Sequence, residues 1–172
     1  MTLLQRVLRL LDAEGVSAAL IGAAALAARG VARSTYDIDL LTTDGRVLVR
    51  ELWTPVLEHD TDVDVRRGDA DDPLAGVVRV TAADERPVDV VVGKWSWQAR
   101  AVQRAERADD GPAVVRARDL VLLKLYAGGT QDLWDVQALL EQTDSDVLAA
   151  EVDEDLASLP AAMRDRWQTV RR

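Results

Sequence analysis

Three aspartates have a spacing and surroundings that suit the binding of a divalent cation. Asp37 and Asp39 flank Ile38 in the run YDIDLLT, where polar and apolar residues alternate as they do in a strand with unlike faces. Their side chains therefore leave the same face of the sheet, with Cβ atoms about 7 Å apart or less, and they repel each other unless a cation lies between them. Because Mg²⁺ prefers oxygen ligands, this pair forms half of a predicted metal site.

Asp89 is the candidate for the other half of this site. It is surrounded by valines in the run VDVVVG. An ionised carboxylate in such a strand is unfavourable unless it is paired, hydrogen-bonded or bound to a metal. Taken alone, each aspartate could equally be a solvent-facing residue, and that interpretation suits Asp62 and Asp64 in DVDVRR. The segment IGAAALAARG, which precedes Asp37 and Asp39, distinguishes the first pair from the second.

The elements that must position these aspartates are those of an α/β protein. The chain has 172 residues, of which 48% are hydrophobic, and this is enough for one well-filled core. We expect an α/β (α+β) fold with a mixed sheet of about four to five strands, near residues 17, 37, 63, 77 and 87, flanked by helices. Residues 1–115 form the predicted core. Residues 116–172 form a small C-terminal helical part that is packed on the core as a single structural unit.

Apolar residues at helical spacing predict the main helices. One helix is expected over residues 45–58. The runs DLVLLKLYAGG and TQDLWDVQALLEQ predict a helix pair interrupted by Gly128 and Gly129, with Thr130 as the N-cap of the second helix. The tail SDVLAAEVDEDLASL has large apolar residues four positions apart and predicts an acidic amphipathic helix.

Charge and composition exclude several classes of protein. The absence of cysteine excludes disulfides and thiolate metal ligands. The net charge of −9 argues against a general nucleic-acid coat protein, since phosphate neutralisation by Lys and Arg supplies most non-specific affinity. Basic residues between positions 94 and 118 could make a local contact with nucleic acid, although a solvated face that balances acidic neighbours is the favoured interpretation. The N-terminus is unlike a secretory signal and no apolar run is long enough to span a membrane, so we expect a cytoplasmic protein.

Two segments carry a resemblance to a known family. LIGAAALAARGVARSTYDIDLLT resembles the signature of the DNA polymerase β-like nucleotidyltransferase superfamily, which has an apolar strand, a Gly-containing turn, a helix and then Asp-apolar-Asp on the next strand. DLVLLKLYAGGTQDLWDVQALL resembles the helix pair of nucleotidyltransferases related to AbiEii toxins, with a Lys in the first helix and an Asp-x-x-Asp start to the second. With the strand of Asp89, these motifs cover most of residues 17–140 in the family's order.

The resemblance implies a metal centre and a nucleotide site. Asp37, Asp39 and Asp89 would be the catalytic metal ligands, holding two Mg²⁺ ions, with Mn²⁺ as an alternative. A nucleoside triphosphate would be the substrate. The residues predicted to bind the nucleotide are Gly22, Ala23, Arg33, Lys124 and Asp132.

The predicted nucleotide-binding residues have distinct roles. Gly22 and Ala23 would form the turn that holds the phosphates, Lys124 would contact phosphate or substrate, and Asp132 would orient or neutralise Lys124. From the residues alone, Lys124 could equally be a surface lysine and Arg33 a solvated arginine. The family usually has Gly or Ser where this chain has Ala23. A Ser hydroxyl could donate to the terminal phosphate, whereas Ala offers only its backbone N–H.

The resemblance implies transfer of a nucleoside monophosphate from a nucleoside triphosphate to an RNA hydroxyl, such as a tRNA 3′ end, or to a protein hydroxyl. It also implies a toxin role with an antitoxin as partner. Two alternatives remain open. The chain could be a catalytically degenerate nucleotidyltransferase-fold protein that binds nucleotide or protein, with Ala23 as the mark of decay, or an interaction domain whose tail is a docking helix.

Overall fold

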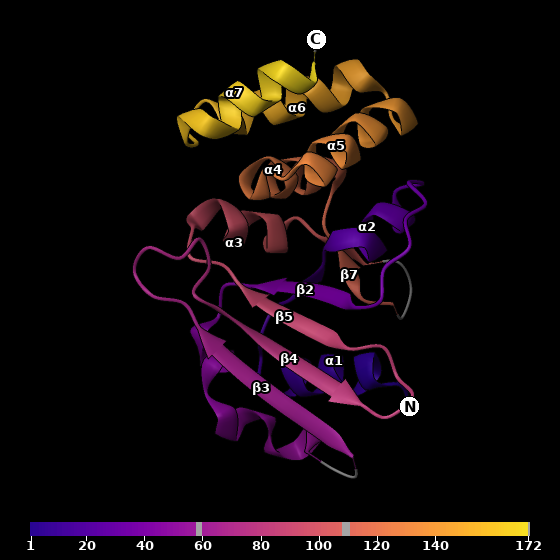
Figure 1. The fold of residues 1–172 in the computed structure, drawn as a ribbon, viewed down its shortest axis with the longest axis vertical. Coiled ribbons are helices and arrows are strands. Elements are labelled where there is room, and N and C mark those ends of the chain that lie inside the picture. Colours follow the sequence, from indigo (N-terminus) through magenta and orange to yellow (C-terminus); the bar gives the residue numbers. More distant parts are fainter. Residues whose placement is uncertain (58–59, 108–110, 172) are drawn as a thin grey trace.

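A mixed sheet forms the centre of the fold, and the computed structural model describes it within residues 1–57, 60–107 and 111–171. Its seven strands lie in the order β3-β4-β5-β2-β1-β7-β6, and Figure 1 labels β2, β3, β4, β5 and β7. The strands are β1 (Ala19–Leu20), β2 (Ile38–Thr42), β3 (Thr61–Arg67), β4 (Gly76–Ala82), β5 (Val88–Val92), β6 (Glu106–Arg107) and β7 (Ala113–Val114).

The α/β class and the mixed sheet are confirmed, but the predicted count of four to five strands is wrong. All five expected segments form strands, from β1 to β5. The two additional strands, β6 and β7, have two residues each and pair with one another in an antiparallel ladder. β6 consists of two charged, exposed residues, so no period-two pattern marks it in the sequence.

The register of the long strands separates a buried face from an open face. β2 and β5 are parallel, whereas β4 is antiparallel to both β5 and β3. Because side chains alternate along a strand, Leu40, Val90 and Val78 point to one face, and all three are fully buried. The aspartates of β2 and β5 point to the other face. Figure 1 shows this second face of β3, β4 and β5 uncovered by any labelled helix.

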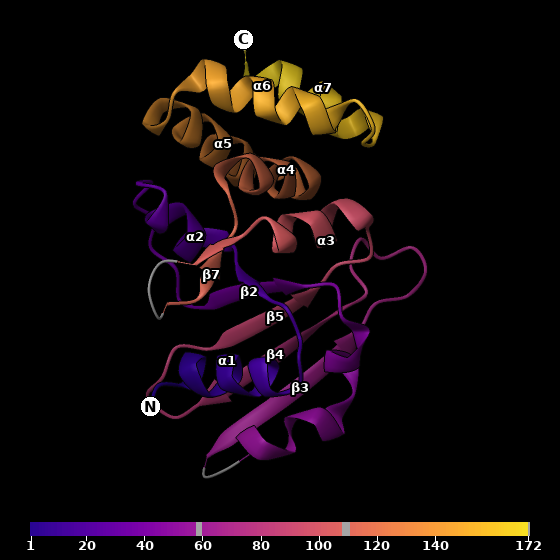
Figure 2. The same ribbon diagram turned by 180° about the vertical axis from the view of Figure 1, so that it is seen from behind.

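The buried face packs against the N-terminal helix and a pair of short 3₁₀ helices. Figure 2 shows α1 (Leu3–Ala13) lying across this side of the sheet. The α-helix predicted for residues 45–58 is wrong, because the chain forms η1 (Gly45–Leu48) and η2 (Arg50–Val56) instead, and residue 58 lies outside the described residues. Val49 is extended between them, and Pro55 has no N–H to donate to a carbonyl four residues earlier.

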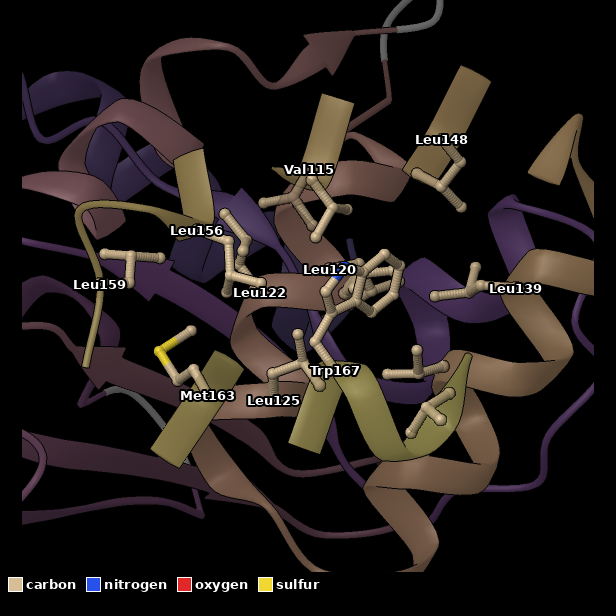
Figure 3. Close-up of a cluster of buried hydrophobic side chains, with 14 of the residues drawn as sticks. Val115, Leu120, Leu122, Leu125, Leu139, Leu148, Leu156, Leu159, Met163 and Trp167 are labelled. Carbon is tan, nitrogen blue, oxygen red and sulfur yellow. The ribbon is translucent and has the colours of Figure 1, made fainter. Parts of the chain in front are cut away.

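The remaining helices form a second layer around a core of their own (Figure 3). They are α2 (Gly22–Ala28), α3 (Ser96–Gln103), α4 (Ala117–Ala127), α5 (Thr130–Gln142), α6 (Ser145–Leu156) and α7 (Ala161–Val170). Figure 1 shows α4 to α7 stacked beyond α2 and α3 at the end of the molecule farthest from β3. Leu120, Leu122 and Leu125 on α4 are almost fully buried at the centre of this layer.

The predicted break between α4 and α5 is confirmed. Gly128 adopts a left-handed conformation with φ of 70° and ends α4. Thr130 was predicted as the N-cap of α5, but it is the first helical residue. Gly129 takes the cap position, and its backbone N–H donates to Oδ2 of Asp132 at 3.1 Å. No described helix is both long enough and apolar enough to span a membrane.

The C-terminal tail packs onto its own fold. Its apolar residues Leu148, Val152 and Leu156 are at most 5% exposed, within the same core as Leu125. The hypothesis of a free docking helix therefore finds no support in α6, since the face that would bind a partner is already buried. α7, which was not predicted, adds Trp167 to this core and completes the layer (Figure 3).

The loop between β3 and β4 is fastened to the helical layer. The hydroxyl of Tyr126 on α4 donates to the carbonyl oxygen of Pro73 at 3.0 Å, and Trp95 Nε1 donates to the same hydroxyl at 2.8 Å. Lys94 Nζ donates to the backbone oxygens of Asp69 and Asp72, both at 2.6 Å. These bonds hold the end of the β3–β4 hairpin beside α3 and α4.

The helical core sets a first prediction. Leu125→Ala should lower the free energy of unfolding by about 2–5 kcal/mol, because it removes a fully buried side chain and leaves a cavity. Val147→Ala on α6, where the side chain is 56% exposed, should change it by less than about 0.5 kcal/mol. Urea denaturation followed by circular dichroism measures both. Equal effects of the two substitutions would contradict the packing described for α4.

Candidate active site

A row of charged residues crosses the open face of the sheet. Asp64, Arg79, Asp89 and Asp39 are consecutive register partners on β3, β4, β5 and β2. Neighbouring strands lie about 4.8 Å apart, so each side chain is close to the next. Asp37 precedes β2 by one residue and is two residues from Asp39, on the same face. The structure thus brings the three predicted aspartates together, at the middle of the sheet.

Arg79 lies among these carboxylates and was not among the residues predicted from the sequence. Its guanidinium donates to Oδ2 of Asp89 at 3.2 Å and lies 3.6 Å from Oδ2 of Asp37. A charged residue alone in the apolar strand GVVRVTA is the same kind of signal that drew attention to Asp89. The sequence contains no information on register, however, so the pairing of Arg79 with Asp89 could not be read from it.

The electrostatics of the row favour a positive charge beside it. The pKa of Asp39 is raised from 3.8 to about 6, chiefly by burial and then by the charges of Asp37 and Asp89. The positive charges of Lys124 and Arg79 oppose this increase. Burial also raises the pKa of Asp89, and Oδ1 of Asp89 is buried without a hydrogen-bond partner among the described residues. A further cation near these oxygens would stabilise their ionised forms.

Gly22 places the start of α2 directly against Asp39. The backbone N–H of Ile21 donates to the carbonyl oxygen of Asp39 at 2.9 Å, which holds the turn on β2. Gly22 has a φ of +63°, and a Cβ atom at this position would collide with the Asp39 carboxylate. Both the backbone conformation and the close approach therefore require glycine. Ala23, the next residue, is buried in the first turn of the helix.

Lys124 on α4 is held by two aspartates of α5. Its Nζ lies 2.9 Å from Oδ1 of Asp132 and 2.8 Å from Oδ2 of Asp135. Asp135 is 3% exposed and also forms an ion pair with Arg33, so one carboxylate holds both predicted cations. Asp135 was not predicted, although it is the second Asp of the Asp-x-x-Asp segment. The Asp-x-x-Asp spacing could have indicated it, because residues three positions apart lie about one helical turn apart on the same side of α5.

The basic residues between positions 94 and 118 are largely engaged within the protein. Arg104 pairs with Asp119 and Asp155, Arg118 with Glu154 and Asp155, and Arg116 with Glu106. Lys94 contacts backbone oxygens, as described above. This agrees with the interpretation that the segment balances acidic neighbours, and it leaves little of this positive charge for a nucleic-acid phosphate.

The donor set of the row suits a hard divalent cation, but its present arrangement does not enclose one. Carboxylate oxygens are the ligands that Mg²⁺ prefers, and Asp89 offers a buried oxygen that is without a partner in the described part of the chain. Within residues 1–57, 60–107 and 111–171, however, no three His, Cys, Asp or Glu side chains are grouped to hold a metal ion. Arg79 takes the place between Asp37 and Asp89 where such an ion would bind.

Solved structures of nucleotidyltransferases share this fold. ANT(2″)-Ia in complex with adenylyl-2″-tobramycin is 17% identical, has a TM-score of 0.58, and the match covers 96% of this chain and 97% of that one. A solution structure of the antibiotic-resistance factor ANT(2″)-Ia is also 17% identical, with a TM-score of 0.59 and coverage of 98% and 92%. At this identity the likeness shows the fold alone. No protein-family model and no curated protein sequence matches the chain.

The turn at Gly22 sets a second prediction. Gly22→Ala should destabilise the protein by at least about 1 kcal/mol more than Gly15→Ala. Both glycines have positive φ, but a Cβ atom at Gly15 would meet open space, whereas at Gly22 it would displace the Asp39 carboxylate. Gly15→Ala therefore reports the backbone strain alone, about 1–2 kcal/mol. Urea denaturation measures both, and equal losses would show that Gly22 does not lie against Asp39.

The raised pKa of Asp39 sets a third prediction. A carboxyl whose pKa rises on folding binds its proton more tightly in the native state, so it contributes stability below 3.8 that is lost as the pH rises through about 6. In EDTA, Asp39→Asn should therefore raise the melting temperature relative to the wild type at pH 7.5, and this advantage should shrink at pH 5. Because the other titrating groups are the same in both proteins, their contribution cancels in the difference between the two melting temperatures. A difference independent of pH would contradict the raised pKa.

Proposed function

We propose that the chain is a metal-dependent nucleotidyltransferase, which transfers a nucleoside monophosphate from a nucleoside triphosphate to a hydroxyl group and releases pyrophosphate. The observation that carries the proposal is the direct pairing of Asp39 with Asp89 on adjacent parallel strands, with the Gly22 turn packed against Asp39. The shared fold of nucleotidyltransferase structures supports it. This arrangement would bring the oxygen ligands of a metal and a turn for the phosphates to one point of the sheet.

The aspartates would hold the cation. Asp37, Asp39 and Asp89 would bind Mg²⁺, as two ions, with Mn²⁺ as an alternative. Bound there, the metal would supply positive charge to neutralise the phosphates and stabilise the negative charge of the transition state. Oδ1 of Asp89, which is buried and without a partner in the described part of the chain, would accept the proton of the acceptor hydroxyl.

The phosphates would lie between α2 and α4. At the first turn of a helix the backbone N–H groups have no intrahelical partner, so those of Gly22 and Ala23 would donate to phosphate oxygens. Lys124 would contact the phosphates from the opposite side, with Asp132 and Asp135 fixing its position. Arg33 would serve as a further phosphate contact once it leaves Asp135.

The acceptor that the structure supports best is a small hydroxyl compound. A hollow of about 290 Å³ adjoins Asp89, beside the β3–β4 loop, and its charged lining is mixed: Asp64, Asp72 and Asp89 with Arg66, Arg67 and Arg79. This volume is close to that of small-molecule sites. The net charge of −9 and the internal pairing of the basic segment disfavour RNA. The ANT(2″)-Ia complex contains adenylyl-2″-tobramycin, which is an adenylylated acceptor of this kind.

The RNA or protein acceptor, the toxin role and the antitoxin partner stay predictions from the family resemblance. The degenerate alternative rests on Ala23, whose methyl group cannot donate to a phosphate. Metal-dependent stabilisation by nucleoside triphosphates distinguishes the two proposals, because a degenerate site would gain none.

The fourth prediction tests the reaction. The wild type, incubated with each α-³²P-labelled nucleoside triphosphate and Mg²⁺, should label one of three acceptor preparations, namely tobramycin, total cellular RNA or total cellular protein. Asp39→Asn should reduce transfer by at least about 10³-fold, because it removes a metal-binding charge that acts in the transition state. Asp62→Asn is the matched control, since Asp62 has the same Asp-x-Asp spacing but is exposed on β3.

Each acceptor preparation tests a different proposal about the substrate. Transfer to tobramycin would support the small-molecule acceptor, and transfer to RNA or protein would instead support the acceptor predicted from the family resemblance. Undiminished transfer by Asp39→Asn would refute the site. The absence of transfer to any acceptor, together with no stabilisation by nucleotide and Mg²⁺, would favour the degenerate protein.

A further inference from the structure

We propose that Arg79 is the counter-ion of the carboxylates when no metal is bound. A divalent cation displaces its guanidinium, which then pairs with Asp64. This inference rests on the proposed function, because it assumes that the aspartates bind a metal. It goes further by assigning a role to a residue outside the predicted site. The arginine would hold the metal-free carboxylates together and would set the cation affinity of the site.

The position of Arg79 is the first support. Its guanidinium contacts Asp89 at 3.2 Å and Asp37 at 3.6 Å, and thus spans two of the three predicted ligands. A divalent cation bound by both carboxylates would occupy the same place. The two positive charges would also repel each other strongly at such a distance in a partly buried site. Arg79 and the cation therefore compete for one position.

A second, independent observation is that Asp89 has a carboxylate oxygen available to bind a metal ion. The residue is 9% exposed, and while its Oδ2 faces Arg79, its Oδ1 is buried without a hydrogen-bond partner in the described part of the chain. A buried carboxylate oxygen left without a partner is unfavourable. Arg79 thus satisfies only part of what Asp89 requires, and a metal ion with its water ligands would satisfy the rest.

The neighbouring strand offers a place for the displaced arginine. Asp64 on β3 is the register partner of Arg79 on the side opposite to Asp89. The side chain of Arg79 is 38% exposed and that of Asp64 is 46% exposed, so the guanidinium can turn towards Asp64 without opening the core. Asp64 now pairs with Arg66 at 2.7 Å, in an exposed contact that contributes little stability. Movement of one side chain along the row therefore exchanges one carboxylate partner for another.

Binding of Mn²⁺ to the metal-free protein tests the proposal without reference to activity. Electron paramagnetic resonance of free Mn²⁺ gives the dissociation constant. Arg79→Gln should tighten binding by about tenfold, because it removes the competing cation. Arg46→Gln, which removes an exposed positive charge outside the row, should change it by less than about threefold. Arg79→Gln should also lower the melting temperature in EDTA, and Mg²⁺ should restore it, which shows that the variant folds.

Asp64→Asn separates the displacement from a general charge effect. In the wild-type background it should weaken Mn²⁺ binding, because Arg79 loses its second partner. In the Arg79→Gln background the same substitution should have a clearly smaller effect. Equal effects in both backgrounds would overturn the proposed role of Asp64.

Two further outcomes would overturn the inference, and they distinguish it from the proposed function. If the wild type and Arg79→Gln bind Mn²⁺ equally well and Asp39→Asn does not bind it, Arg79 is no competitor, while the metal site stands. If neither the wild type nor Arg79→Gln binds Mn²⁺ in the presence or absence of nucleoside triphosphate, both the inference and the proposed metal-dependent function fail.

Discussion

Repulsion between like charges is the constraint on which the site depends. The pairing of β2 with β5 places Asp39 directly beside Asp89, and Asp37 lies on the same face. The register cannot shift by one residue to relieve this repulsion, because Leu40, Val88, Val90 and Val92, which are buried in the core beneath the sheet, would then turn to the face of the aspartates. The hydrophobic core thus fixes the carboxylates in place. Positive charge has to come to them, and Arg79 and Lys124 supply it from β4 and α4.

The parts of the site that could be predicted from the sequence are those that depend on local pattern. An Asp-apolar-Asp segment on a strand, a lone Asp among valines and a glycine before a helix are all visible without a structure. The proximity of Asp64 and Arg79 to Asp89 is not visible in this way, because it follows from the antiparallel register of β3, β4 and β5. Asp135 lay within a recognised segment, but its contact with Arg33 joins residues that are far apart in the sequence.

The fold shows the same division between local and tertiary information. The five longer or better-patterned strand segments and the α4–α5 break were predicted, since each has a clear period or a glycine stop. The 3₁₀ helices were mistaken for an α-helix because apolar residues three and four apart suit both kinds of helix, and only Pro55 pointed to the difference. β6 and β7 form through tertiary pairing, with β7 lying parallel to β1 and antiparallel to β6.

The two hydrophobic cores have a consequence for the energetics of ligand binding. One core lies beneath the sheet that carries the aspartates, and the other lies among the helices that carry Lys124 and its partners. A triphosphate that bridges Asp39 and Lys124 would draw its binding free energy from groups that both cores hold in place. A compound that occupies only one side would contact only one of these sets of groups, so its affinity would give a poor measure of how well the complete substrate binds.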